Sequence, residues 1–278
     1  MILIADSGST KCHWAYLDKK KSNPYFFETI GLNPYFFSEI DIIEELQKSE
    51  LKNIANNVKE VFFYGAGCSL DDLKKNMQNA LNVVFVNARI FVYHDLIGAC
   101  RSTFNNKKNI NCIIGTGSIA CLYDGKDAVP SIPSLGFILG DEGSGNYFGK
   151  KLLNLYFSNK LPVDLRKKFK EKYHLNYEDL LNNVYQNNRA NSFLSSFFPF
   201  LLQYKYFDQV LDEGIEEFLR AHVFCIKDYQ NYEINFIGSV AYHLKDFILK
   251  KSKKFNFSIG IFVKSPIRKL VDFHSCDK

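Results

Sequence analysis

Two short loops of small and hydroxyl residues are the parts of this sequence best suited to bind phosphate. The first phosphate loop is residues 6–10, Asp-Ser-Gly-Ser-Thr, and the second is residues 115–118, Gly-Thr-Gly-Ser. Such residues in a tight turn let several backbone N–H groups converge on an anion. The carboxylate of Asp6 beside that anion is useful only if a divalent cation offsets the repulsion, which indicates magnesium. Taken singly, each loop is more typical of an ordinary hairpin turn.

Two further turns are candidates for ligand contact. The acidic loop, residues 139–145, reads Leu-Gly-Asp-Glu-Gly-Ser-Gly and sets two adjacent carboxylates among three glycines. This is an unfavourable core element and a costly turn unless a ligand approaches closely, so we favour a functional role. Residues 236–241, Phe-Ile-Gly-Ser-Val-Ala, join a predicted strand to a predicted helix. An adenine ring or ribose could lie against this backbone, although by itself it is a generic strand-to-helix turn.

Each phosphate loop is expected between the first two strands of one half of the chain. In the first half, apolar and alternating runs predict strands at residues 2–5, 12–17, 25–29, 61–64 and 90–93, and helical spacing predicts helices from Ser38, from Ser69 and after Asp95. In the second half, strands are predicted at residues 111–114, 119–123, 135–139, 234–237 and 257–263, with helices at 241–249 and after Pro266. The repeated order indicates two related α/β halves.

A helical insertion, residues about 146–230, interrupts the second half after its third predicted strand. Pro199 lies in an aromatic helical stretch of this insertion. Because a proline lacks the N–H group and clashes with the preceding turn, we expect Pro199 to kink or end that helix.

Two other nucleotide-binding motifs are excluded. Gly115, Gly117 and Ala120 match the dinucleotide pattern G-x-G-x-x-A, but residues 119–123 predict a strand where that motif needs a helix. No acidic residue lies at the expected ribose distance after a second strand. The sequence also contains no G-x-x-x-x-G-K-[ST] motif. Neither a Rossmann site nor a P-loop is expected.

Composition narrows the class of protein. The chain has 278 residues, 46% hydrophobic and 23% charged, as is usual for a globular protein. Its net charge of +5 comes from scattered basic residues, so no nucleic-acid partner is expected. No signal peptide and no run of about 20 apolar residues is visible, so we expect no membrane partner. Seven cysteines without C-x-x-C spacing are typical of reduced thiols in the cytoplasm.

In their order along the chain, these motifs resemble the N-acetylglucosamine kinase branch of the actin-like ATPase superfamily, also known as the BadF/BadG/BcrA/BcrD ATPase family. The resemblance covers nearly the whole chain, and the acidic loop is its most specific part. The matching segments are residues 6–10, 31–33, 64–67, Asp95, 115–118, 136–144 and 238–241. The resemblance implies two RNase H-like domains with mixed sheets and a cleft between them: residues 1–108 with a returning helix at about 266–278, and residues 109–265.

The resemblance also implies an activity and a set of site residues. The activity is ATP-dependent phosphorylation of an amino sugar, N-acetylglucosamine first, at O6. Asp95 matches the catalytic base, although its position also permits a helix N-cap. Asp6 would hold Mg²⁺. The implied ATP contacts are Ser9, Thr10, Lys11, Gly115, Thr116, Gly117, Ser118, Gly238, Ser239 and Ala241. The implied sugar contacts are Asn33, Gly65, Asp95, Thr116, Gly136 and Asp141. We expect a homodimer.

The sequence departs from the family pattern at two places. Residues 134–136 read Ser-Leu-Gly where many members carry Gly-Trp-Gly, which removes an aromatic wall near the sugar. The turn at residues 64–67 is rich in glycine where relatives often have a serine. These departures leave the identity of the sugar open.

Two other functions are alternatives to the kinase. One is the activator ATPase of a radical dehydratase, whose cluster is bridged by cysteines of a dimer; Cys112 and Cys121 flank the second phosphate loop but lack cluster-like spacing. The other is a nucleotide- or sugar-binding regulator without turnover. The joint presence of Asp6, Asp95 and Asp141 with both loops is evidence against such a regulator.

Overall fold

The chain forms two compact units, each built on a sheet of five strands. The computed structural model describes residues 1–8, 10–18, 23–187 and 189–276. Unit 1 comprises residues 1–108, 123–128 and 265–278, and unit 2 comprises residues 109–122 and 129–264. The strand order is β3-β2-β1-β4-β5 in the first sheet and, in equivalent positions, β8-β7-β6-β9-β10 in the second. This agrees with the predicted repeat and confirms the predicted α/β fold.

The strands agree with the sequence prediction in most places. They are β1 (Ile2–Ser7), β2 (Lys11–Leu17), β3 (Tyr25–Ile30), β4 (Glu60–Gly65), β5 (Arg89–His94), β6 (Asn109–Ile114), β7 (Ser118–Tyr123), β8 (Ala128–Pro130), β9 (Glu233–Ile237) and β10 (Ser258–Val263). In unit 1, β1 pairs antiparallel with β2 and parallel with β4, which pairs parallel with β5. Their registers align Ser7 with Gly65 and Gly65 with His94, so three carboxyl ends meet at one edge of the sheet.

The helices flank the two sheets. The α-helices are α1 (Glu39–Lys48), α2 (Asp71–Val84), α3 (Asp95–Thr103), α4 (Gly136–Leu139), α5 (Gly145–Phe157), α6 (Val163–Tyr173), α7 (Tyr177–Leu181), α8 (Ala190–Ser195), α9 (Phe198–Leu201), α10 (Asp208–Phe218), α11 (Ser239–His243), α12 (Lys245–Phe255) and α13 (Ile267–Cys276). Short 3₁₀ helices are η1 (Glu50–Asn53), η2 (Ala55–Asn57), η4 (Lys205–Phe207) and η6 (Tyr229–Asn231), and π-helical turns are η3 (Asn182–Gln186) and η5 (Leu219–Val223).

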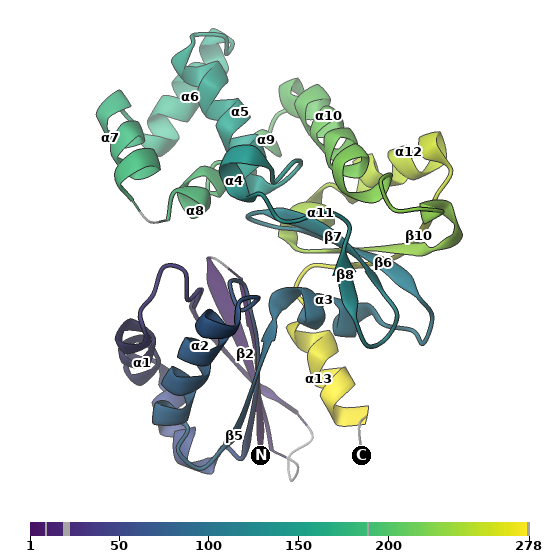
Figure 1. The fold of residues 1–278 in the computed structure, drawn as a ribbon. Helices are drawn as coiled ribbons and strands as arrows, with labels where there is room; N and C mark the ends of the chain where they lie inside the picture. Colours follow the sequence, from purple (N-terminus) through teal and green to yellow (C-terminus); the bar gives the residue numbers. More distant parts are fainter. Residues whose placement is uncertain (9, 19–22, 188, 277–278) are drawn as a thin grey trace. The chain divides into compact units, whose positions relative to one another are not determined.

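Alternation along β4 divides the core of unit 1 into two layers. Phe63 packs with Leu46 and Leu81, which come from α1 and α2. The next residue, Tyr64, points to the opposite face of the sheet and packs with Leu270 of α13. Figure 1 shows α1 and α2 on one side of this sheet and α13 with α3 on the other. The C-terminal helix is therefore part of the layer that contains the start of α3.

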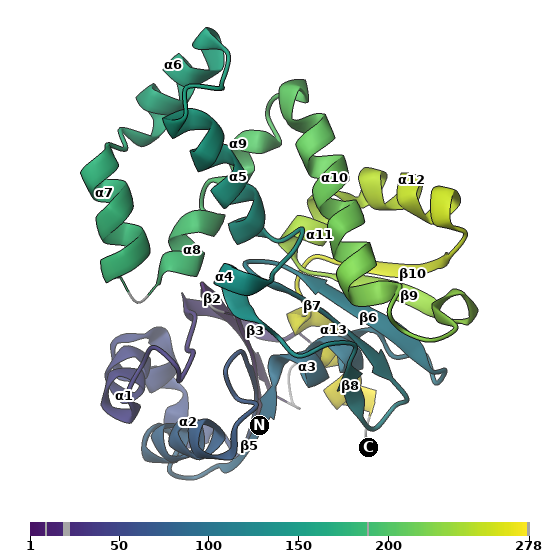
Figure 2. The ribbon, with the colours of Figure 1, turned by 45° about the horizontal axis from the view of Figure 1, so that its top comes forward.

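Unit 2 buries an aromatic core beneath its helices. Phe148, Phe169, Phe200 and Phe218, all nearly inaccessible to solvent, come from α5, α6, α9 and α10. In Figure 2, α10 and α12 lie side by side over the second sheet. Within the described residues, no helix combines the length and the apolar character needed to cross a membrane.

Two predictions in the second half are wrong. Residues 135–139 were expected as its third strand, but residues 136–139 form the short helix α4, and β8 takes the strand position. A short apolar run has no periodicity that separates strand from helix, and Gly136, with φ of 67°, turns the chain into the helical bend. The predicted helix 241–249 is two helices, because the chain leaves α11 at Leu244 before α12 begins.

Two helix boundaries also differ from the prediction. Ser69 was expected to open a helix, but α2 begins at Asp71 and its cap residue is Leu70, whose side chain forms no capping hydrogen bond. Pro199 was expected to kink or end a helix, yet it lies in the first turn of α9. A proline is tolerated there because the N–H group it lacks would have had no helical partner.

Candidate functional site

The first phosphate loop begins with the last two residues of β1, at the edge where three parallel strands end. Ser7, the buried last residue of β1, accepts the N–H of Leu32 at its Oγ (2.9 Å), and its carbonyl accepts the N–H of Ala66 (2.8 Å). The loops after β3 and β4 are thereby held beside the end of β1. Ser9, a predicted phosphate contact, lies outside the described residues. Thr10 accepts the N–H of Gly31 at its carbonyl (2.9 Å).

Lys11 is exposed at the start of β2. Its ammonium group lies 2.6 Å from the carboxylate of Glu28 on the neighbouring strand β3. The predicted contact of Lys11 with a phosphate would have to compete with this ion pair. Because both partners are well exposed, the pair contributes little and a phosphate could displace it.

The carboxylates of Asp6 and Asp95 interact electrostatically at the same edge of the sheet. Burial and, second, the charge of Asp95 raise the pKa of Asp6 to about 7. A divalent cation would replace the proton on Asp6 and offset the repulsion between the two groups, so Asp6 fits the role of a magnesium ligand. Among the described residues, no group of three or more His, Cys, Asp or Glu side chains could hold a metal ion. Phosphate oxygens of a bound nucleotide and water would therefore complete the coordination.

Asp95 is the first residue of α3, and the cap position that was its alternative role belongs to His94. The Asp95 carboxylate accepts the N–H of Leu96 (2.8 Å) and lies 3.2 Å from Nε2 of His94. Farther along α3, a Cβ at Gly98 would lie 2.8 Å from Cβ of Tyr64, so the helix backbone lies directly on β4. This close packing fixes the position of Asp95 at the edge of the sheet.

Asn33 and two glycines follow the strands β3 and β4 of unit 1. Oδ1 of the buried Asn33 accepts the N–H of Tyr35 (3.0 Å). A Cβ at Gly67 would lie only 2.2 Å from that oxygen, and the φ angle of Gly67 is +81°. At Gly65, a Cβ would lie 2.3 Å from the ring of Phe63. Both positions therefore require glycine, and at Gly67 the missing side chain lets the Asn33 amide lie close to the backbone after β4.

The second phosphate loop is held by the start of α5. The N–H of Gly145 donates to the carbonyl of Gly115 (2.8 Å). Both the backbone N–H (3.1 Å) and the side-chain Nδ2 (2.7 Å) of Asn146 donate to the carbonyl of Thr116. The loop carbonyls are thus turned toward the helix. The sequence analysis missed Asn146, since a polar residue in the first turn of a helix is commonplace.

Asp141, a predicted sugar contact, braces the same loop. Its carboxylate accepts the N–H of Ser118 (3.1 Å) and Nδ2 of Asn146 (2.7 Å). A Cβ at Gly117 would lie 2.8 Å from one carboxylate oxygen. Burial raises the pKa of Asp141, and these hydrogen bonds act against the shift. A sugar hydroxyl would have to use the remaining lone pairs. Gly136 lies at the start of α4, with no atom within 4 Å of a Cβ built on it.

The turn at residues 236–241 lies against the second phosphate loop. Gly238, with φ of +111°, would place a Cβ 2.4 Å from the carbonyl oxygen of Ile114 and 3.3 Å from the nitrogen of Gly115. Ser239 and the buried Ala241 follow in α11. The predicted adenosine contacts of unit 2 therefore pack directly against the backbone that leads into the second phosphate loop.

Gly238→Ala should weaken both stability and nucleotide binding. Alanine at this φ angle is strained and its methyl group would displace Ile114, so we expect a loss of at least about 1 kcal/mol of unfolding free energy and several-fold weaker ATP binding. Thermal unfolding and calorimetric titration with ATP measure the two effects. Gly115→Ala is the stability control, because a Cβ there has no atom within 4 Å. Equal melting temperatures for the two variants would contradict the prediction.

The structure thus groups the predicted residues by unit. Unit 1 brings together Asp6, Thr10, Asn33, Gly65 and Asp95, while Lys11 is engaged by Glu28. Unit 2 brings together residues 115–118, Asp141 and Gly238.

The chain is similar to solved structures that are described as putative sugar kinases. One, described as a "Putative N-acetylglucosamine Kinase" from Porphyromonas gingivalis, is 32% identical with a TM-score of 0.91, covering 100% of this chain and 99% of that chain. Another of that description, from Chromobacterium violaceum, is 13% identical with a TM-score of 0.70 over 98% of each chain. A "putative N-acetylmannosamine kinase" from Listeria monocytogenes is 10% identical with a TM-score of 0.51, covering 100% and 99%. The last two show the fold alone. No protein-family model and no curated protein matches the chain.

Proposed function

Because the chain belongs to the N-acetylglucosamine kinase-like family of sugar kinases with the actin-like ATPase fold, we propose that it transfers the γ-phosphoryl group of ATP to an amino sugar. N-acetylglucosamine is the proposed substrate and O6 the proposed acceptor atom. The observation that carries the proposal is the interaction of Asp6 with Asp95 beside the first phosphate loop. Two carboxylates that interact electrostatically at such a loop suit a metal-assisted transfer to a hydroxyl group.

Asp95 is the proposed base of the reaction. As the sugar oxygen attacks the γ-phosphorus, Asp95 accepts the hydroxyl proton and ADP leaves with the electrons of the broken P–O bond. Asn33 and Gly65 orient the sugar from unit 1, and the proposed contacts of unit 2 are Thr116, Gly136 and Asp141. Magnesium held at Asp6 would neutralise negative charge on the phosphates.

The proposed ATP contacts follow the two loops and the turn after β9. Backbone N–H groups of the loops bind phosphate oxygens, since preorganised donors are effective where charge develops. These contacts are Ser9, Thr10 and Lys11, then Gly115, Thr116, Gly117 and Ser118, and for the adenosine Gly238, Ser239 and Ala241. We also propose that the protein is a cytoplasmic homodimer. Each chain would contain one RNase H-like domain at residues 1–108 plus 266–278 and a second at residues 109–265.

The burial of two cysteines favours a kinase over an activator ATPase. Cys112 and Cys121 are fully buried in unit 2, and burial raises the pKa of the Cys112 thiol. A cluster bridged between two subunits requires thiolates at the surface. Neither cysteine beside the second phosphate loop meets this requirement.

A screen for phosphoryl transfer tests the proposal. Purified protein, [γ-³²P]ATP and Mg²⁺ are incubated with N-acetylglucosamine, N-acetylmuramic acid, glucosamine, N-acetylmannosamine and glucose. We expect the highest kcat/KM with N-acetylglucosamine and a phosphate on O6 by NMR. Transfer only to another sugar would correct the substrate. Folded protein that binds ATP but transfers nothing would favour the regulator without turnover.

A further inference from the structure

The helix α10 and its π-helical continuation η5 have two faces with different partners. Asp212, Glu216 and Arg220 recur every four residues, and so do Gly214, Phe218 and His222. The two series are two residues apart, about 200° around a helix, so they lie on roughly opposite faces. The first series contacts α12, and the second contacts the acidic loop.

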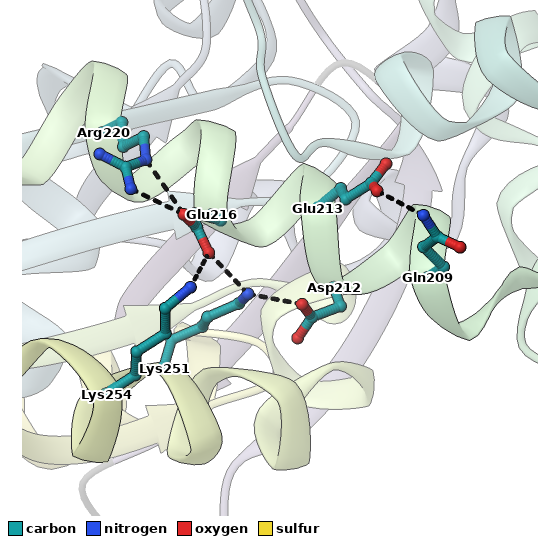
Figure 3. Close-up of polar contacts among 7 residues, drawn as sticks. All are labelled: Gln209, Asp212, Glu213, Glu216, Arg220, Lys251 and Lys254. Atoms are coloured by element: carbon teal, nitrogen blue, oxygen red, sulfur yellow. Dashed lines mark hydrogen bonds and ion pairs between the residues drawn. The ribbon is translucent and has the colours of Figure 1, made fainter.

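The first face is anchored to α12 by ion pairs (Figure 3). Nζ of Lys251 lies 2.5 Å from Asp212 and 2.8 Å from Glu216. Glu216 also pairs with Lys254 (2.9 Å) and with Arg220 (2.8 Å). Hydrogen bonds from Lys251 and these neighbours hold the pKa of Glu216 at about 2. Lys251 is only 5% exposed, so its ammonium group is largely shielded from water while its two ion pairs link α10 to α12.

The second face contacts the acidic loop at three successive turns. A Cβ at Gly143, whose φ angle is +67°, would lie 2.7 Å from the carbonyl oxygen of Gly214 and 2.9 Å from Cβ of Phe218. One turn farther, Nε2 of His222 lies 3.0 Å from Oε2 of Glu142. The imidazole stacks on Phe218, with ring centroids 5.0 Å apart and an interplanar angle of 25°.

The bond between His222 and Glu142 determines the orientation of the imidazole. His222 is 3% exposed, and within the described part of the chain its Nδ1 has no hydrogen-bond partner. The tautomer with hydrogen on Nε2 fits, because it donates to Glu142 and leaves no buried N–H unpaired. The ring is therefore held by Phe218 and by one hydrogen bond.

The contact continues from Glu142 into the second phosphate loop. The carbonyl of Glu142 accepts the hydroxyl of Ser118 (2.7 Å). The adjacent Asp141 accepts the N–H of the same serine (3.1 Å). A change in the position of Glu142 would therefore also move the hydrogen-bond acceptors of Ser118, which are the Glu142 carbonyl and the adjacent Asp141 carboxylate.

We propose that His222 is a positioning residue: through Glu142 it holds the acidic loop in the conformation that orients Asp141 and Ser118. A π-helical turn carries His222, a feature frequent at functional sites. The inference rests on the proposed kinase function, because it assigns ligand binding to these two loops. The acidic loop packs against α10, whose position is in turn fixed by its ion pairs with α12.

Hydrogen exchange of the protein without ligands tests this role independently of activity. His222→Phe keeps an aromatic ring against Phe218 but removes the donor. We expect about tenfold faster exchange at the amide of Ser118 and across residues 140–146, with β6 and β9 unchanged. His222→Gln, which retains an N–H donor, should restore part of the protection. Arg220→Gln, on the opposite face and 60% exposed in its ion pair, is the control and should leave this exchange unchanged.

Steady-state kinetics then connect the loop to the reaction. His222→Phe should lower kcat/KM for the sugar about tenfold, with partial rescue by His222→Gln, whereas a merely structural role would lower only the melting temperature. If His222→Phe does not fold, Glu142→Met is the second variant, because it removes the hydrogen-bond acceptor from a partly exposed side chain. It should cause the same increase in exchange at Ser118 and residues 140–146. Unchanged exchange at Ser118 and residues 140–146, or equal acceleration throughout unit 2, would overturn the proposal. A wild-type protein without transfer activity would refute the kinase, while the exchange comparison still decides the role of His222.

Discussion

Asp95→Asn should lower kcat for phosphoryl transfer by about 10²–10⁴-fold, the range expected for loss of a general base. The asparagine has the same shape and its Oδ1 can still accept the N–H of Leu96, but it cannot take the hydroxyl proton. ATP binding should be retained, because Asp95 acts on the sugar. A coupled assay of ADP formation measures kcat, and calorimetry measures the Kd for ATP.

Asp71→Asn provides a matched control for this substitution. Asp71 is the first residue of α2, as Asp95 is of α3, and it is exposed in the same unit. Both substitutions remove a favourable charge at a helix N-terminus, which is worth a few tenths of a kcal/mol. Only Asp95→Asn should affect turnover. Equal kcat values for wild type and Asp95→Asn would rule out the base, and equal losses in both variants would indicate an effect of helix stability.

The sequence was most informative where the signal is local. The loops at residues 6–10 and 115–118 were located correctly where neighbouring strands meet, because apolar or alternating runs on either side of each loop indicate two strands. The run at residues 135–139 failed, since four apolar residues fit a helical turn as well as a strand. Its side chains confirm the difference, because Ile138 and Leu139 are 76% and 74% exposed and form no core.

Contacts between distant segments could not be predicted in this way. His222 and Glu142 are separated by 80 residues, and neither has a neighbour in sequence that indicates the other. Asp141 was predicted as a sugar contact, yet its hydrogen bonds to Ser118 and Asn146 depend on how the acidic loop folds back onto β7. A sequence pattern identifies the groups that can bind a ligand, whereas tertiary structure determines which of them first bind one another.

Asp6→Asn should stabilise the protein above pH 7 and abolish its activity. The pKa of Asp6 is raised from 3.8 to about 7, so the folded state holds this proton more tightly than the unfolded state. Stability is therefore complete below pH 3.8, falls as the pH rises through 7, and stays low above it. Asparagine cannot lose a proton, so the variant should avoid this loss, which is on the order of a few kcal/mol. It should also lack the proposed magnesium ligand.

Urea unfolding of wild type and Asp6→Asn at pH 5 and pH 8, without metal or ATP, measures this difference. The variant should gain less at pH 5, which lies between the unfolded and folded pKa values of Asp6, than at pH 8, which lies above both. Magnesium with ATP should then stabilise the wild type at pH 8 and the variant much less, because binding to the folded state adds stability. Equal gains at the two pH values would show that the proton of Asp6 does not control stability. A variant that keeps full transfer activity would show that Asp6 does not hold magnesium. The two readouts thus separate the electrostatic destabilisation caused by Asp6 from its role in the reaction. A gain in stability together with a loss of turnover is expected where a residue serves ligand binding and not the stability of the fold.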